Sequence, residues 1–148
     1  PETKGLIASI HKRLFILQGD MTHLDTAIEE LEKAYGLYHG YYNGDNLAYC
    51  LNLKASVVED EEEREELNIE ARRIRKEIIN KNKGIVVEEI DTEEEIWMIS
   101  TLAICYFALN KKEKATKCES LFLSKADRDM KKSYLEQKER MFKLLNIN

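Results

Sequence analysis

The chain has 148 residues, 43% of them hydrophobic and 34% charged, and a formal net charge of −5 at pH 7. This length fits one domain over residues 1–148, large enough to bury roughly two-thirds of the surface that the unfolded chain exposes. The acidic balance argues against a nucleic-acid partner, because phosphate binding needs a clustered basic face. No apolar run approaches the roughly twenty residues of a membrane-spanning helix. A single proline and six glycines leave few places where a helix must end, so we expect an all-α protein.

The three cysteines, Cys50, Cys105 and Cys118, are odd in number and have no CxxC spacing. This usage predicts reduced core thiols in a cytoplasmic protein, and neither a disulfide framework nor a zinc site. A contact between Cys105 and Cys118 across a helical hairpin is the alternative. The sequence begins at Pro1 and shows no secretory signal, so we expect a domain that is part of a longer protein.

The N-terminal part of the chain predicts two helices. Thr3 can cap the first, whose apolar residues recur at helical spacing as far as Leu17, and Gly19–Asp20 ends it. Thr22 or Asp25 opens the second helix. Its small and apolar residues at helical spacing are Leu24, Ala27, Ile28, Leu31, Ala34 and Tyr35.

The segment Tyr41–Ala48 predicts a corner between helices. Asn43–Gly44 is a turn signal, and Asp45 or Asn46 can cap the helix that follows. Several tyrosines lie close together here, and packing at the corner is favoured over an aromatic recognition patch. These tyrosines are Tyr38, Tyr41, Tyr42 and Tyr49.

The run Glu59–Glu66 consists of seven acidic residues and one arginine. Calcium loops need alternating ligands around a glycine, which this run does not have. Basic residues follow later in the same stretch, and acid first with base last is the order that the helix dipole prefers. We therefore expect a solvated helix from about Asp60 to Lys83, ended by Gly84, and then an extended connector at Ile85–Val87.

The stretch Trp97–Ala115 predicts a tight helical hairpin. Asp91 or Thr92, with Glu95 three residues after Thr92, forms a capping box for the helix that contains Trp97. Asn110 ends that helix because asparagine tolerates the left-handed conformation. Small side chains let two antiparallel helices approach closely, and an aromatic ring fills the gap between them. The residues that fit this pattern are Leu102, Ala103, Tyr106 and Ala115.

This spacing resembles the tetratricopeptide repeat, a helical hairpin of 34 residues. A last helix begins at Ala126–Asp127, and such a helix commonly seals the exposed end of a solenoid. The chain therefore predicts a right-handed array of about three tetratricopeptide-like hairpins, with helices paired 1–2, 3–4 and 5–6, plus a C-terminal capping helix. That makes seven helices in all.

A second resemblance covers most of the chain. Its segments, in order, are Pro1–Ile7, His11–Phe15, Ala27–Ile28, Tyr41–Asn46 and Trp97 with Thr101–Ala103. They resemble the TRAF-binding regulatory domain of the apoptosis signal-regulating MAP kinase kinase kinases and of bacterial proteins. The resemblance implies a tetratricopeptide-type array used for protein–protein contacts and regulation, without catalysis. Glu119 stands where the resemblance leads us to expect an aromatic residue.

The sequence shows no catalytic pattern. His11, His23 and His39 are separated and fit no paired-ligand spacing. There is no glycine-rich phosphate loop and no nucleophile elbow. We therefore expect no catalytic, cofactor-binding or metal-binding residues.

The expected function is a non-catalytic interaction and regulatory scaffold that binds a protein or peptide on the concave face of the array. The alternative is a helical enzyme, or an accessory domain of one, with a site assembled between helices. A ligand with a carboxylate and an apolar group would suit the cations and aromatic rings of the candidate surface. The candidate partner-binding residues are Lys12, Arg13, Asn46, Tyr49, Trp97 and Thr101.

Overall fold

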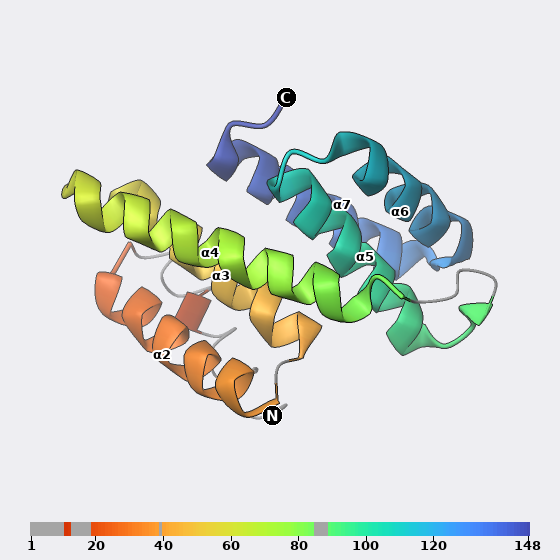
Figure 1. Cartoon of the computed structure of the whole chain (residues 1–148), viewed down its shortest axis with the longest axis horizontal. Helices are drawn as coiled ribbons and strands as arrows, with labels where there is room; N and C mark the ends of the chain where they lie inside the picture. The colour runs from red at the N-terminus through yellow and green to blue at the C-terminus, as the bar shows by residue number, and fades with distance from the viewer. Residues whose placement is uncertain (1–10, 13–18, 39, 85–88) are drawn as a thin grey trace. The chain divides into compact units, whose positions relative to one another are not determined.

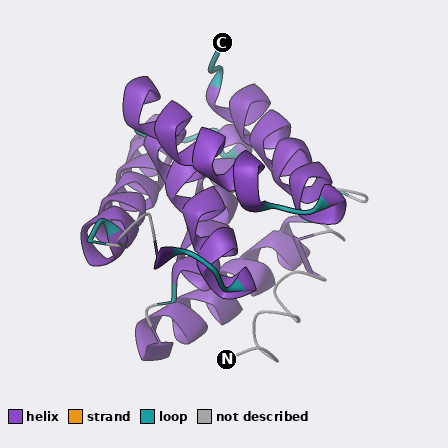
Figure 2. Ribbon diagram, turned by 90° about the vertical axis from the view of Figure 1, so that its right-hand side faces the viewer, coloured by secondary structure: helices purple, strands orange, loops and turns teal. Residues whose placement is uncertain are grey.

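The computed structural model describes residues 11–12, 19–38, 40–84 and 89–148. Their regular structure is helical, as expected for an all-α protein (Figures 1 and 2). The helices are α2 (Met21–Tyr38), α3 (Tyr41–Val57), α4 (Glu61–Asn82), α5 (Glu93–Ala108), α6 (Lys112–Lys125) and α7 (Arg128–Leu145).

The described residues thus hold six helices, against the seven expected. The missing one is the first, which falls mostly outside the described residues, although His11 and Lys12 are helical. The expected cap at Thr3 and the connector Ile85–Val87 also lie outside them.

The chain divides into two compact units, Pro1–Ile74 and Arg75–Asn148, and each is described by itself. Helix α4 runs across the division. That residues 1–148 form a single domain stays a prediction.

In the first unit, consecutive helices run antiparallel. An ion pair of 3.0 Å between Lys54 Nζ and Asp25 Oδ1 joins α3 to α2. Asn52 Nδ2 donates to Asn68 Oδ1 at 2.8 Å and so joins α3 to α4. Each pair lies at nearly equal distances in sequence from the turn between its helices, as an antiparallel hairpin requires. The buried residues of α2 are those expected from its helical spacing: Leu24, Ala27, Ile28, Leu31, Ala34 and Tyr35.

The start of α2 differs from the prediction by a few residues. The helix begins at Met21, and Asp20 Oδ1 accepts a hydrogen bond of 2.9 Å from the Thr22 backbone N–H. Asp20 therefore takes the capping role that the sequence assigned to Thr22 or Asp25. This hydrogen bond lowers the pKa of the Asp20 carboxyl below its ordinary value.

The predicted corner at Asn43–Gly44 is wrong. Helix α3 already begins at Tyr41, with Gly40 at its N-cap and no side-chain capping bond, so Asn43–Gly44 is helical. Asp45 and Asn46 are inside the helix and do not cap it. The physical reason is burial: Asn43, Gly44 and Asp45 all lie within the packed part of the unit, and tertiary packing outweighs a local turn preference.

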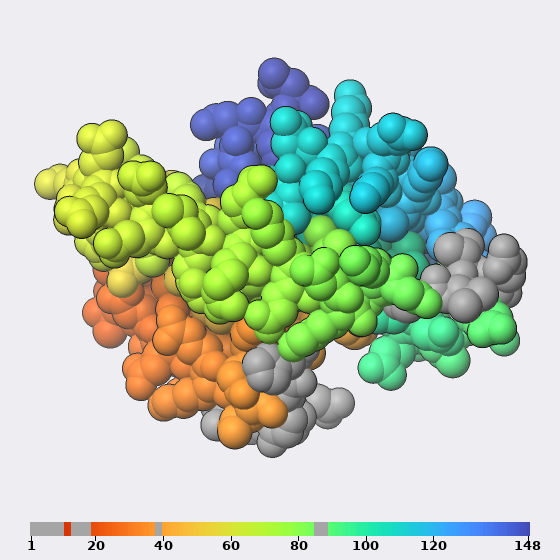
Figure 3. Space-filling view, viewed as in Figure 1, coloured from red at the N-terminus to blue at the C-terminus, as the bar shows by residue number. Residues whose placement is uncertain are grey.

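Helix α4 follows the expected order of charge. Glu61, Glu62 and Glu63 occupy its first turn and Lys81 its last, each at the end that the helix dipole favours. Gly84 lies in the turn that follows it. Its apolar stripe includes the buried Ala71, Ile74 and Ile78. One side of α4, coloured yellow to green, is open to the viewer in Figure 3.

In the second unit, the predicted signals at both ends of α5 are confirmed. Thr92 accepts from the Glu95 backbone N–H at 3.2 Å, and Glu95 Oε1 accepts from the Thr92 N–H at 3.2 Å, which completes the capping box. Asn110 adopts the left-handed conformation, with φ of 60°. The backbone N–H groups of Asn110 and Lys111 then donate to the Phe107 and Tyr106 carbonyls, a Schellman ending that satisfies two terminal acceptors.

Helices α5 and α6 form the expected hairpin, and the residues that predicted it are in the core. Ala103 and Ala115 are fully buried, and Leu102 and Tyr106 are nearly so. The Trp97 and Phe122 ring centroids lie 6.2 Å apart across the two helices. Cys105 is buried and Cys118 half-buried, and both carry free thiols, as does the buried Cys50.

Helix α7 packs on this hairpin, in keeping with the predicted capping role. Asp127 caps it by accepting from the Met130 backbone N–H at 2.9 Å. The Phe107 and Phe142 rings meet edge to face, 5.2 Å between centroids, and Phe122 lies 4.9 Å from Tyr134. Tyr134 therefore contributes a fully buried ring to a core shared by α6 and α7.

Candidate functional site

The first candidate site lies where Lys12 meets α3 in the first unit. Lys12 Nζ donates to Asn46 Oδ1 at 3.1 Å and lies 5.6 Å from the centre of the Tyr49 ring. Asn46 and Tyr49 are three residues apart, so one face of α3 presents both. Asn46 is itself held by a hydrogen bond of 3.0 Å from Nδ2 to the Tyr42 carbonyl. We call Lys12, Asn46 and Tyr49 the lysine cluster.

The separation of Lys12 and Asn46 along the chain has a structural meaning. The two residues are 34 positions apart, which is the length of one tetratricopeptide unit. Lys12 and Asn46 are therefore one repeat length apart in the sequence.

Polar side chains are also buried on α3, the helix that carries Asn46 and Tyr49. Asn43 is 7% exposed and Asp45 4% exposed. Among the described residues, Asn43 Oδ1 is a buried acceptor without a hydrogen bond. Native proteins seldom leave such an acceptor unsatisfied. The sequence missed both residues because Asn43–Gly44 was interpreted as a turn; helical spacing back from Leu47 and Cys50 was the signal that could have found them.

Burial and nearby charged side chains shift the pKa of the Cys50 thiol. Burial raises its pKa to about 11, the nearby Lys12 ammonium lowers it, and the Asp45 carboxylate raises it. A cation and a buried anion thus act on the same thiol. Because the thiol stays protonated at neutral pH, Cys50 is poorly suited to act as a nucleophile.

Two histidines lie beside Lys12. His11 Nδ1 and His23 Nδ1 are 3.2 Å apart, and their rings are 5.4 Å between centroids. A hydrogen bond between two imidazole nitrogens needs one donor and one acceptor, so at least one ring is neutral in this arrangement. In the described part of the chain, no group of three or more histidine, cysteine, aspartate or glutamate side chains could hold a metal ion.

The other residues of the predicted site are placed differently. Arg13 lies outside the described residues. Trp97 and Thr101 belong to the second unit, where the Trp97 ring is half-buried against Phe122. Thr101 is buried, and its hydroxyl donates to the Trp97 carbonyl at 3.3 Å. The structure thus brings Lys12, Asn46 and Tyr49 together. Binding of a partner by any of the six residues stays a prediction.

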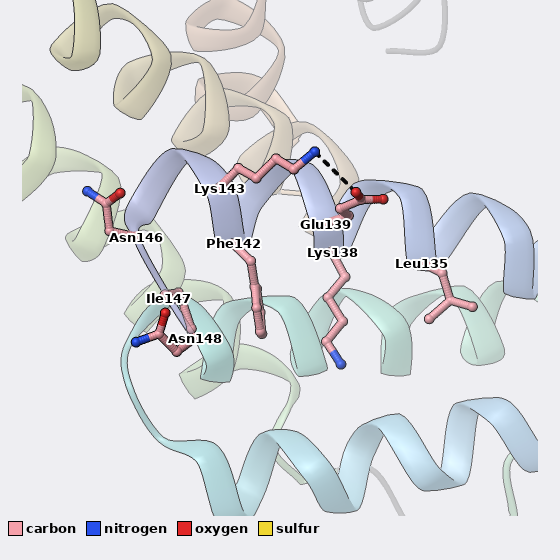
Figure 4. Close-up of a pocket in the computed structure, with 8 residues that line it drawn as sticks. All are labelled: Leu135, Lys138, Glu139, Phe142, Lys143, Asn146, Ile147 and Asn148. Atoms are coloured by element: carbon pink, nitrogen blue, oxygen red, sulfur yellow. Dashed lines mark ion pairs between the residues drawn. The ribbon is translucent and has the colours of Figure 1, made fainter.

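A hollow of about 560 Å³ lies at the C-terminal end of α7. Figure 4 shows the side chains of Lys138, Phe142 and Ile147 on one side of the helix, and the ion pair between Glu139 and Lys143 on another. Lys138 Nζ is bound by Glu119 Oε2 at 2.6 Å and lies 4.6 Å from the centre of the Phe107 ring. Lys138 is therefore engaged in holding α7 on the hairpin. The lysine cluster is the candidate site because it contains three of the predicted residues.

The comparisons with known proteins bear on the same part of the chain. A family model described as Tetratricopeptide Repeats-Sensor matches residues 1–51. No curated protein and no solved structure matches the chain. The match supports a tetratricopeptide-type repeat, and its 51 residues include the whole lysine cluster. Repeats of this type generally serve as protein-binding scaffolds and not as catalysts.

Among the described helices, none is long and apolar enough to cross a membrane.

Proposed function

We propose that this chain is a protein-interaction module of a regulatory, cytoplasmic protein, and that the lysine cluster is part of its binding surface. The observation that carries the proposal is the contact of Lys12 with Asn46 and Tyr49 across one repeat length. In a tetratricopeptide array the first helix of each hairpin lines the concave side. The lysine cluster draws its residues from two such helices, so it would face a ligand held there.

The chemistry of the cluster favours a segment with a carboxylate and an apolar group. The Lys12 ammonium donates to the Asn46 carbonyl, and a carboxylate is the charge-assisted acceptor that suits an ammonium. The half-buried Tyr49 ring offers amphipathic contact area at a low cost in side-chain entropy. The fit supports an acidic peptide or loop that carries a leucine or an aromatic residue.

The resemblance to the TRAF-binding regulatory domain and the word sensor in the matched family description both favour a regulatory role. In this proposal the partner is a protein, and the chain reports or transmits its presence without a reaction of its own.

The proposal is tested with an immobilised library of synthetic peptides that pair aspartate or glutamate with leucine or phenylalanine. The strongest binder is then measured in solution by fluorescence anisotropy. Lys12→Glu and Tyr49→Ala are each expected to weaken binding about tenfold or more, as contact residues at the centre of an interface do. Lys132→Glu, an exposed change on α7, is the matched control and is expected to keep the parent affinity.

The melting temperatures of all three variants are compared with that of the parent, so that a folding defect is not mistaken for lost contact. Parent-like affinity in both Lys12→Glu and Tyr49→Ala would remove the lysine cluster from the binding surface.

A further inference from the structure

The outward face of α4 in the first unit carries an ordered set of charges around one apolar residue. Ile69, at the centre of this set, is 59% exposed. Charged and exposed residues flank it at helical spacings of three and four, so they share its face of the helix. We call this set the α4 face: Glu62, Glu65, Glu66, Ile69, Arg72 and Arg73.

The charges of the α4 face change sign at Ile69. Every acidic member precedes it and both basic members follow it, with Glu66 and Arg72 at equal distances on either side. A second copy of the helix, reversed in direction about a two-fold axis through Ile69, would place its acidic half beside the basic half of the first. Glu65 would then meet Arg73, and Glu66 would meet Arg72. A parallel copy would instead bring like charges together, which is unfavourable.

The surface beside Ile69 has room for such a partner. A hollow of about 400 Å³ is lined by Glu65, Ile69, Arg72 and other residues of the same helix. Val57, at the end of α3, adds a second exposed apolar side chain in the same unit, 48% exposed. Arg73 already binds Glu70, with Nη2 to Oε1 at 2.6 Å, but a guanidinium has five N–H donors and can serve a second carboxylate.

We propose that two copies of this chain associate through the α4 face, as an antiparallel pair with Ile69 at the two-fold axis. The interface is isologous, because the same residues act on both sides. It has one central apolar residue per copy and is otherwise charged, so the dimer is weak and depends on ionic strength. This association is independent of the lysine cluster, which takes a different ligand on different residues.

The first experiment is sedimentation equilibrium of the full chain over a range of protein concentrations. The proposal expects a monomer–dimer equilibrium at 50 mM salt that weakens about tenfold at 500 mM salt, because exposed ion pairs are screened. A chain that stays monomeric at every concentration in low salt would overturn the proposal.

The decisive experiment exchanges the charges. The double variant Glu65→Arg/Glu66→Arg gives both halves of the face a net positive charge, and Arg72→Glu/Arg73→Glu makes both halves acidic. Each is expected to be monomeric alone, because its own copies repel. Mixed in equal amounts, the two are expected to form a heterodimer, which a merely structural role of these residues would not produce.

Far-UV circular dichroism and melting curves establish that both double variants fold like the parent. Retained self-association of either variant, or failure of the mixture to associate, would show that the two copies do not pair through the α4 face.

Discussion

Ala103 and Ala115 are fully buried on α5 and α6, the two helices of the hairpin in the second unit. A small side chain at such a position sets how closely two helices approach. These alanines and Asn110 were identified from sequence because local geometry requires them: a small side chain at the helix contact, and a residue that tolerates the left-handed conformation at the helix end. The Lys12–Asn46 contact, between residues 34 apart, could not be read from the sequence in the same way.

Replacing Ala103 or Ala115 with leucine is expected to overpack the hairpin and lower the free energy of unfolding by about 1–3 kcal/mol. Urea denaturation of each variant measures the change. Ser120→Leu, at an exposed position of α6, is the control and should change stability by less than about 0.5 kcal/mol. If the alanine variants unfold at the parent's urea midpoint, these side chains do not lie at the helix contact.

Glu95 gives a prediction that depends on pH. Its hydrogen bonds with Thr92 lower the pKa of the Glu95 carboxyl below the ordinary value of 4.5. A carboxyl with a lowered folded-state pKa stabilises the fold above its unfolded pKa, and this stabilisation is lost as the pH falls through the folded-state value. Parent and Glu95→Gln should therefore differ in urea midpoint at pH 7, and the difference should close as the pH falls below 4.5.

The control repeats this comparison in a Thr92→Ala protein, which lacks the hydroxyl that binds Glu95. The pH-dependent difference in urea midpoint between glutamate and glutamine at position 95 should be smaller in that protein. A difference that is the same at every pH, or the same without the Thr92 hydroxyl, would show that the capping box is not its cause.

At the scale of whole elements, the helices whose ends carry strong local signals were predicted well. The capping box begins α5 and Asp127 begins α7, both as the sequence indicated. The start of α3 was predicted wrongly, because the turn preference of Asn43–Gly44 is weaker than the effect of tertiary packing. Asn43 and Asp45 are buried within the helix, and their burial depends on distant parts of the chain that a local pattern does not show.

Glu119 shows how one element is fixed to another. It stands where the family resemblance led us to expect an aromatic residue, and instead it accepts from Tyr134 Oη at 2.6 Å and from Lys138 Nζ at 2.6 Å. Burial and this carboxylate both raise the pKa of the Tyr134 hydroxyl. The Glu119 and Lys138 side chains are only 19% and 22% exposed, so the pair is poorly screened by water.

Glu119→Ala is expected to cost about 2–3 kcal/mol of unfolding free energy, because it leaves a buried hydroxyl and a half-buried ammonium without their acceptor. A double-mutant cycle with Lys138→Met should give a coupling energy of about 1 kcal/mol or more. The exposed pair Lys143–Glu139, at 3.1 Å, is the comparison and should couple by less than about 0.5 kcal/mol. Equal coupling in the two pairs would mean that Glu119 does not hold α7 in place.

For the molecule as a whole, the open question is whether the two compact units unfold together. The chain has one tryptophan, Trp97, which lies in the second unit. Its fluorescence therefore reports on that unit, while far-UV circular dichroism reports on all helices. A single domain over residues 1–148, as the sequence predicts, requires the two signals to change at the same urea concentration. Separate midpoints would divide the chain into two independently folding domains.

The claim that the lysine cluster binds a partner is tested most directly by nuclear magnetic resonance. The ¹⁵N-labelled chain is titrated with the acidic, apolar peptide selected from the library, and changes in backbone amide shifts are mapped onto the structure. The account predicts that the largest changes fall at Lys12, Asn46 and Tyr49 and are lost in Lys12→Glu. Largest changes at Leu135–Asn148, around the hollow on α7, would contradict it.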